Sequence, residues 1–186
     1  MSGALELRAR IREDIAAIET LRTGRYAPPW AYCADPGRSA HGEDFAVVVL
    51  RVSDEFYGAG TDTDAGTYAD PDEPGGRMAA AHEEFETERW GVVLALDERW
   101  GAHRVLSTAP YEERETAGAV VPPLFAALIE LGYSGDVQIW DAEGRSEGHS
   151  EGRPEGRVVG VGVGQMDKEE PVVLFAAALA PACTAD

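Results

Sequence analysis

Apolar residues recur at helical spacing in three segments of the chain. In residues 5–22 they follow one another at steps of three or four, with arginine and glutamate between them, and Gly24 then ends the predicted helix. A second helix, apolar on one side only, is predicted for residues 77–89. A third is predicted for residues 122–132, where two prolines open the helix and Gly132 closes it. The third helix is apolar on most sides, so we expect it to be buried.

Six short segments carry the dense apolar or β-branched runs that are typical of strands. The first, residues 45–52, is apolar enough to be buried on both faces. The tetrapeptide Glu-Arg-Trp-Gly occurs twice, and its two copies bracket residues 92–97, which are predicted to form a hairpin with residues 103–108. The other strands are predicted at residues 137–142, 157–166 and 171–180, the last two joined as an antiparallel pair by a short polar turn.

Two stretches have no apolar period. Residues 53–77 are predicted to form a long acidic loop rich in glycine, and loops of that length are usually functional or lack a fixed structure. Residues 143–157 repeat a short unit of glutamate, glycine and a basic residue between two predicted strands, and they offer nothing apolar to bury. We interpret them as a low-complexity hairpin loop that serves as a spacer. The alternative is a recognition arm that uses Arg145, His149, Arg153 and Arg157.

These elements predict a single domain over residues 1–186, of the α+β class. We expect a mainly antiparallel sheet of five to six strands with two or three helices packed largely on one face. The helices at residues 5–22 and 122–132 are expected to share that face, with the helix at residues 77–89 near the edge.

Charge narrows the range of partners. The formal net charge is −18, from 34 acidic and 16 basic residues, and the segment from Gly42 to Thr116 contributes −12 of it. Such a field repels phosphates and anionic membrane surfaces, so we expect no nucleic acid and no membrane, but a protein partner with a basic or neutral surface. Cys33 and Cys183 show no paired spacing, and the N-terminus has no apolar leader core, which predicts a cytoplasmic protein. The oligomeric state stays open.

No motif identifies a catalytic residue, and no cofactor or metal is predicted. Asp62, Asp64, Asp70 and Glu73 have the spacing of a calcium loop, but the glycine and one ligand that such a loop needs at its centre are missing, which favours a solvated acidic loop. Cys33 and His41 would make a nucleophile and a base on one loop. The acidic residues around them disfavour a thiolate, so a partly buried structural cysteine is the preferred interpretation.

The run Gly-Val-Gly-Val-Gly at residues 160–164 lacks the third glycine and the following helix of a dinucleotide site. In a strand its glycines share one bare face, which predicts the close approach of the third helix, or alternatively of a ligand. Trp30, between Tyr26 and Tyr32, would form an aromatic anchor for a partner if it were exposed.

The composition favours a non-enzymatic interaction protein, of the immunity-protein or adaptor kind, that binds a basic or neutral protein. Its surface is predicted to comprise the acidic loop, the helix at residues 77–89 and one aromatic anchor: Asp62, Asp64, Asp70, Asp72, Glu73, Glu83, Glu84, Glu86 and Trp30. One alternative is a small enzyme with a carboxylate-lined site at the sheet edge, built from Asp54, Glu55, Glu112, Glu115 and Arg114. Another is a cation-binding acidic loop. Carboxylates that face each other in an apolar cleft would favour the enzyme, and exposed ones the binding surface.

Overall fold

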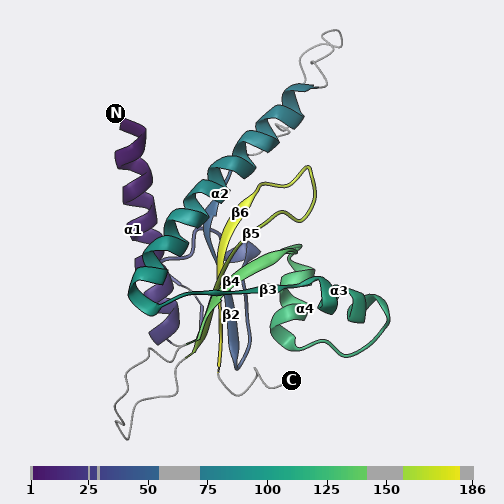
Figure 1. Cartoon of the computed structure of the whole chain (residues 1–186). Coiled ribbons are helices and arrows are strands. Elements are labelled where there is room, and N and C mark those ends of the chain that lie inside the picture. The colour runs from purple at the N-terminus through teal and green to yellow at the C-terminus, as the bar shows by residue number, and fades with distance from the viewer. Residues whose placement is uncertain (1, 25, 29, 55–71, 142–156, 181–186) are drawn as a thin grey trace, which may run out of the picture.

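A six-stranded sheet forms the centre of the computed structural model, which describes residues 2–24, 26–28, 30–54, 72–141 and 157–180 (Figure 1). The elements follow one another along the chain as α1 Ser2–Thr23, η1 Pro36–Arg38, β1 Ala40–His41, β2 Phe45–Val52, α2 Asp72–Trp100, β3 Arg104–Ser107, α3 Ala109–Thr116, α4 Pro123–Glu130, β4 Asp136–Trp140, β5 Val158–Gly164 and β6 Val173–Leu179. The predicted α+β class with a mainly antiparallel sheet is confirmed.

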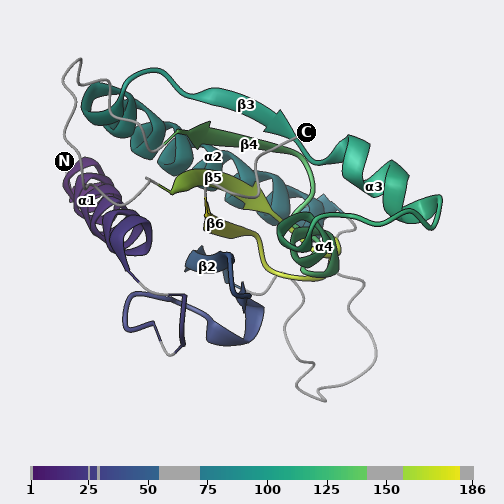
Figure 2. The same ribbon diagram turned by 90° about the horizontal axis from the view of Figure 1, so that it is seen from below.

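Every neighbouring pair of strands in the sheet is antiparallel, in the order β1-β2-β6-β5-β4-β3. Figure 2 shows β3 at one side of the sheet and β2 toward the other, with β4, β5 and β6 between them. The first six residues of β2, Phe45 to Leu50, are all buried, as their uninterrupted apolar run predicts. The predicted antiparallel pairing of the last two strands is also confirmed, with Val161 opposite Ala176.

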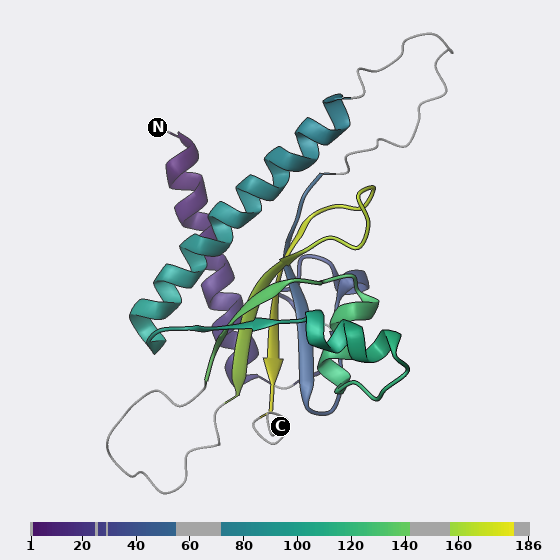
Figure 3. The ribbon, with the colours of Figure 1, turned by 45° about the vertical axis from the view of Figure 1, so that its right-hand side comes forward.

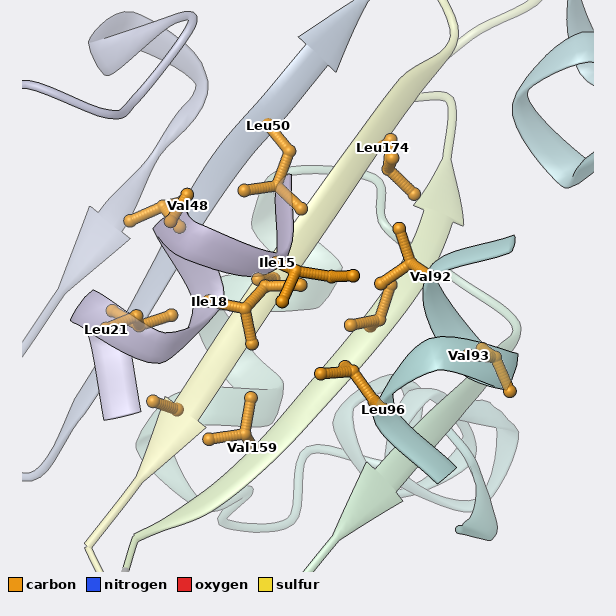
Figure 4. Packing of buried hydrophobic residues seen from close by; sticks show 14 of the residues in the cluster. Ile15, Ile18, Leu21, Val48, Leu50, Val92, Val93, Leu96, Val159 and Leu174 are labelled. Carbon is orange, nitrogen blue, oxygen red and sulfur yellow. The ribbon is translucent and has the colours of Figure 1, made fainter. Parts of the chain in front are cut away.

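Helices cover both faces of the sheet, because alternate residues of the central strands project into two separate cores. Val48 and Leu174 point to the face that carries α1 and α2, where Ile18 and Leu96 meet them (Figure 4). On the other face the residues that alternate with them pack against Leu124 and Leu128 of α4 and Tyr111 of α3. The prediction that the helices at residues 5–22 and 122–132 share one face is therefore wrong: α2 lies beside α1, and α4 lies opposite.

The helix α2 corrects a second prediction, because it runs without a break through residues 92–97, which were expected to form a strand. The two valines in this segment favour a strand, but they continue the helical period of the buried residues before them. The glycine of the first Glu-Arg-Trp-Gly copy, Gly91, lies against α1, since a Cβ there would be 2.3 Å from Ile11 Cδ1. Figure 3 shows α1 running beside α2. The glycine of the second copy, Gly101, has φ +90° and donates its N–H to the Asp97 carbonyl, which ends the helix.

The predicted hairpin is wrong for the same reason. The segment at residues 103–108 does contain a strand, β3, but it pairs with β4, so that Val105 lies opposite Gln138. The short helix α3 that follows was not predicted. Residues 142–156 of the low-complexity repeat lie outside the described residues, and the strands that flank the repeat, β4 and β5, are antiparallel neighbours with Trp140 opposite Val159.

Side chains of β4 and two aromatic rings fill the bare glycine face of β5: Gly160 faces Val137 and Ile139, and the other two glycines face the rings. Its three glycines do share the side of the sheet on which α4 lies, but a Cβ at Gly162 would meet the Phe175 ring of β6 at 2.5 Å. At Gly164 a Cβ would meet Tyr133, which follows α4, at 2.7 Å. The close approach therefore comes from two stacked rings, whose centroids are 4.8 Å apart, and not from the body of the helix.

Among the described helices, none has both the length and the apolar character needed to cross a bilayer.

Candidate protein-binding surface

One face of α2 exposes two large apolar side chains between acidic residues. Trp90 is 45% exposed and Leu94, one helical turn later, is 63% exposed. The exposed residues Glu83, Thr87 and Glu98 continue the same face at steps of three or four. We call these five residues the Trp90 stripe. Neither Glu83 nor Glu98 forms an ion pair with a residue that the structure describes, so both carboxylates face solvent beside an apolar centre.

The indole of Trp90 is held in place although it is exposed. The guanidinium of Arg89 lies 4.7 Å from its ring centroid, and the His103 ring contacts it edge-on at 6.2 Å. Arg89 is itself buried and bonded to Gln138 on β4 and to Glu86. The ring is therefore positioned by groups that are anchored in the sheet.

Behind this surface, Asp97 organises a cluster of rings. Its carboxylate accepts hydrogen bonds from Trp140 Nε1 at 3.0 Å and from both the backbone N–H and ring Nδ1 of His103, each at 3.0 Å. Trp100 stacks edge-on against Trp140 at 6.1 Å, so three of the four tryptophans gather at this end of α2. Among the described residues His103 hydrogen-bonds only to Asp97. Because Asp97 lies on α2 and His103 directly precedes β3, the pair acts as a clamp between this helix and this strand.

The edge strand β3 extends this surface. Leu106 packs into the core on the α4 side of the sheet, so its neighbour Val105 points to the α2 side, where it is 57% exposed. Val105 lies two residues beyond His103 and opposite Gln138, the partner of Arg89. Exposed apolar side chains thus occur on both the helix and the strand that border Trp90.

A separate ionic cluster joins α1, α2 and β2. Asp14 and Glu88 are each only 3% exposed, and Arg51 Nε lies 3.5 Å from Asp14 Oδ1 and 3.3 Å from Glu88 Oε1. Burial, followed by the hydrogen bond to Glu88, raises the pKa of Asp14 from 3.8 to about 8, against the opposing effect of Arg51. Arg10 pairs with Glu88 at 3.1 Å and with Glu84 at 2.8 Å. The two arginines thus connect the carboxyl groups of α1 and α2 with one another and with β2.

Some of the acidic residues that were predicted to bind a partner are already paired within the protein, and others lie outside the described residues. Glu84 is engaged by Arg10 and Glu86 by Arg89, so these two acids are not free to attract a partner, whereas Glu83 is. Asp62, Asp64 and Asp70, with the proposed calcium loop, lie outside the described residues. Asp72 and Glu73 begin α2, but the structure describes only the backbone of these two residues and not their side chains.

Trp30 is 7% exposed and lies in the core beside α1 and α2, so it is not an exposed anchor. The exposed tryptophan is Trp90, which belongs to the first Glu-Arg-Trp-Gly copy and was therefore expected just before a strand. The signal that could have found it was the helical period of Phe85, Val92 and Leu96, which places residue 90 on the outer face.

Among the described residues, the groups expected for an enzyme have other partners or are exposed, and Glu55 of the predicted carboxylate site lies outside the described residues. Cys33 contacts the Ser39 hydroxyl at 3.0 Å, while His41 is exposed and packs against the Trp30 ring. Glu112 accepts a hydrogen bond from Thr108, and Glu115 is exposed. In the described part of the chain no hydrogen bond or ion pair links Asp54 to Glu112, and no three His, Cys, Asp or Glu side chains are arranged to hold a metal.

The described surface includes two cavities next to the α4 side of the sheet. One, of about 270 Å³, lies between the start of α4 and the turn before β2 and is lined by Phe45, Leu124 and Phe125. The other, of about 380 Å³, is lined by Arg38, Tyr133 and Glu170. In the second, Arg38 is already paired with Asp35 and Glu170, and burial raises the pKa of Tyr133. The charged groups that line the second cavity are therefore paired with one another, whereas the first cavity also borders the exposed carboxylate of Glu43.

The fold and this surface define an acidic α+β protein with an exposed, fixed tryptophan on its longest helix. Comparison with protein-family models, with curated proteins and with solved structures finds no match.

Proposed function

We propose that the protein is a non-enzymatic interaction protein, of the immunity-protein or adaptor kind, that binds a basic protein partner through the Trp90 stripe. One observation carries this proposal: Trp90 is 45% exposed and yet fixed between Arg89 and His103. Tryptophan dominates binding energy at protein interfaces. A ring that is already positioned loses little conformational freedom when a partner covers it, so more of the contact energy appears as affinity.

The charges favour a basic partner. Glu83 and Glu98 frame the apolar centre, and the whole chain carries a net charge of −18. Acidic groups at the rim of an apolar centre increase the association rate of a basic protein and disfavour acidic competitors. The acidic residues predicted from the sequence between residues 62 and 73 would add to the same long-range field.

The test is affinity capture from a lysate of the source cells at low salt. Immobilised wild-type protein is compared with a Trp90→Ala, Leu94→Ser double variant. A hot-spot tryptophan and its apolar neighbour should cost at least about 2 kcal/mol of binding free energy, so we expect a basic protein to be retained by the wild type and lost from the variant. Calorimetry with the purified partner should then give a dissociation constant raised by at least about thirtyfold.

Leu5→Ser is the matched control, because Leu5 is 65% exposed on α1 and lies outside the stripe. It should retain the partner at wild-type strength, and the circular dichroism spectra of all variants should superimpose. Equal capture by the wild type and the double variant would refute the proposal.

A further inference from the structure

The helices on the α1–α2 face lie mainly over the middle strands of the sheet and leave its β3 edge exposed. The principal contacts of α1 are with β6, β2 and β5, and those of α2 are with β5 and β6. At the β3 edge the same face bears Val105, which is 57% exposed, beside the exposed Trp90 and Leu94 of α2. On the opposite face Leu106 of the same strand packs into the α4 core.

The uncovered strip has the width of one helix. Adjacent strands lie about 4.8 Å apart, so β3 lies about 10 Å from β5 across β4. The axes of packed helices are also separated by about 8–10 Å. A helix placed beside α2, which lies over β5, would therefore lie over β3 and contact Trp90, Leu94 and Val105 together.

We infer that this strip is the docking position for an amphipathic basic helix of the partner, which would pack beside α2 over β3. The inference rests on the proposed function, because it specifies the partner's contacting element at the same surface. Apolar residues of the incoming helix, one turn apart, would cover Trp90 and Leu94. Its lysine or arginine residues would lie at both ends, toward Glu83 and Glu98, which are 15 residues apart, or about 22 Å along α2.

Glu83 and Glu98, at the two ends of the stripe, favour a basic helix over a second copy of the chain as the partner that covers the apolar strip. In a symmetric pair of copies the stripes would bring Glu83 and Glu98 of one chain close to the same residues of the other, and each chain carries a net charge of −18. Like charges brought together at an interface are unfavourable. A basic helix satisfies both the apolar centre and the two acidic ends.

The test uses the full chain labelled with 5-fluorotryptophan, whose Trp90 signal is the fluorine resonance lost in Trp90→Phe. The probe is a synthetic helical peptide with two leucines one turn apart at its centre and lysines beyond them at both ends. We expect a saturable shift of the Trp90 resonance, with binding weakened at least tenfold in a Glu83→Gln, Glu98→Gln variant. Glu113→Gln, an exposed acid on α3, is the matched control and should change nothing.

Two further peptides decide the outcome. One has the same composition with a central proline, which cannot form the helix, and the other carries glutamate in place of lysine. Equal binding of the proline peptide would overturn the helix and favour an extended segment on the β3 edge, while leaving the proposed function intact. Failure of every peptide to shift the Trp90 resonance would also overturn the helix inference. A Trp90-dependent dimer in sedimentation would overturn it in favour of a second copy. The proposed function fails separately, if lysate capture does not depend on Trp90 and Leu94.

Discussion

Two glycines with the same backbone conformation experience different surroundings. Gly132 has φ +70° and Gly118 has φ +72°, a region that costs a non-glycine residue about 1–2 kcal/mol. A Cβ at Gly118 would meet nothing within 4 Å, whereas at Gly132 it would lie 2.3 Å from the Met166 Cα. We expect Gly118→Ala to lower the free energy of unfolding by about 1 kcal/mol, and Gly132→Ala by at least about 2 kcal/mol more, because backbone must move. Urea denaturation measures both, and equal losses would refute the close contact.

The buried Asp14 makes stability depend on pH. Its pKa is about 8 in the folded protein and 3.8 without burial, so between these values only the folded state holds the proton. Unfolding then releases a proton, and the contribution of Asp14 to stability falls as pH rises from about 4 to about 8. Asp14→Asn keeps the size of the side chain and a donor toward Glu88 but cannot ionise. Its free energy of unfolding should therefore increase relative to that of the wild type as pH rises through this window, and the difference should stay constant at higher pH.

Urea denaturation of both proteins at pH 5, 7 and 9 checks this expectation. Glu13→Gln, on the same helix and 71% exposed, is the control, and its effect should vary by less than about 1 kcal/mol over that range. A difference between Asp14→Asn and the wild type that stays constant from pH 5 to pH 9 would contradict the buried, protonated carboxyl.

Among the elements, those with one dominant period were predictable, whereas α2 was predicted only over residues 77–89 of its span from Asp72 to Trp100. The predicted strand at residues 45–52 agrees with β2, and the helix at residues 5–22 agrees with α1 within a few residues at each end. In α2 the valines after Gly91 mimic a strand, and the glycine mimics a turn. Gly91 in fact leaves room for the Ile11 side chain of α1. This role depends on a tertiary contact that cannot be read from the local sequence. Because the second half of α2 was expected to form a strand, the Trp90 stripe was not predicted either.

The connection between β4 and β5 can be shortened, because the strands it joins are already paired at that end, with Trp140 opposite Val159. Deleting Ser146 to Pro154 keeps Arg157, whose guanidinium lies 4.3 Å from the Tyr26 ring centroid. Loop closure depends only weakly on length, so the free energy of unfolding should change by less than about 1 kcal/mol. Urea denaturation of the deletion variant measures this. A loss above about 2 kcal/mol would show that the repeat is part of the folded structure.

At the scale of the molecule, the position of β6 sets the order in which the chain can fold. This strand lies between β2 and β5, yet about 120 residues separate the end of β2 from its start. At a synthesis rate of about 5–20 residues per second, the ribosome needs about 6–24 s to supply it. During that time the apolar residues of β2, Phe45 to Leu50, have no inner neighbour to pair with. The growing chain therefore holds this apolar strand without its inner partner until late in translation, and until then chaperones and the chain's own negative charge must keep the strand from pairing with other chains.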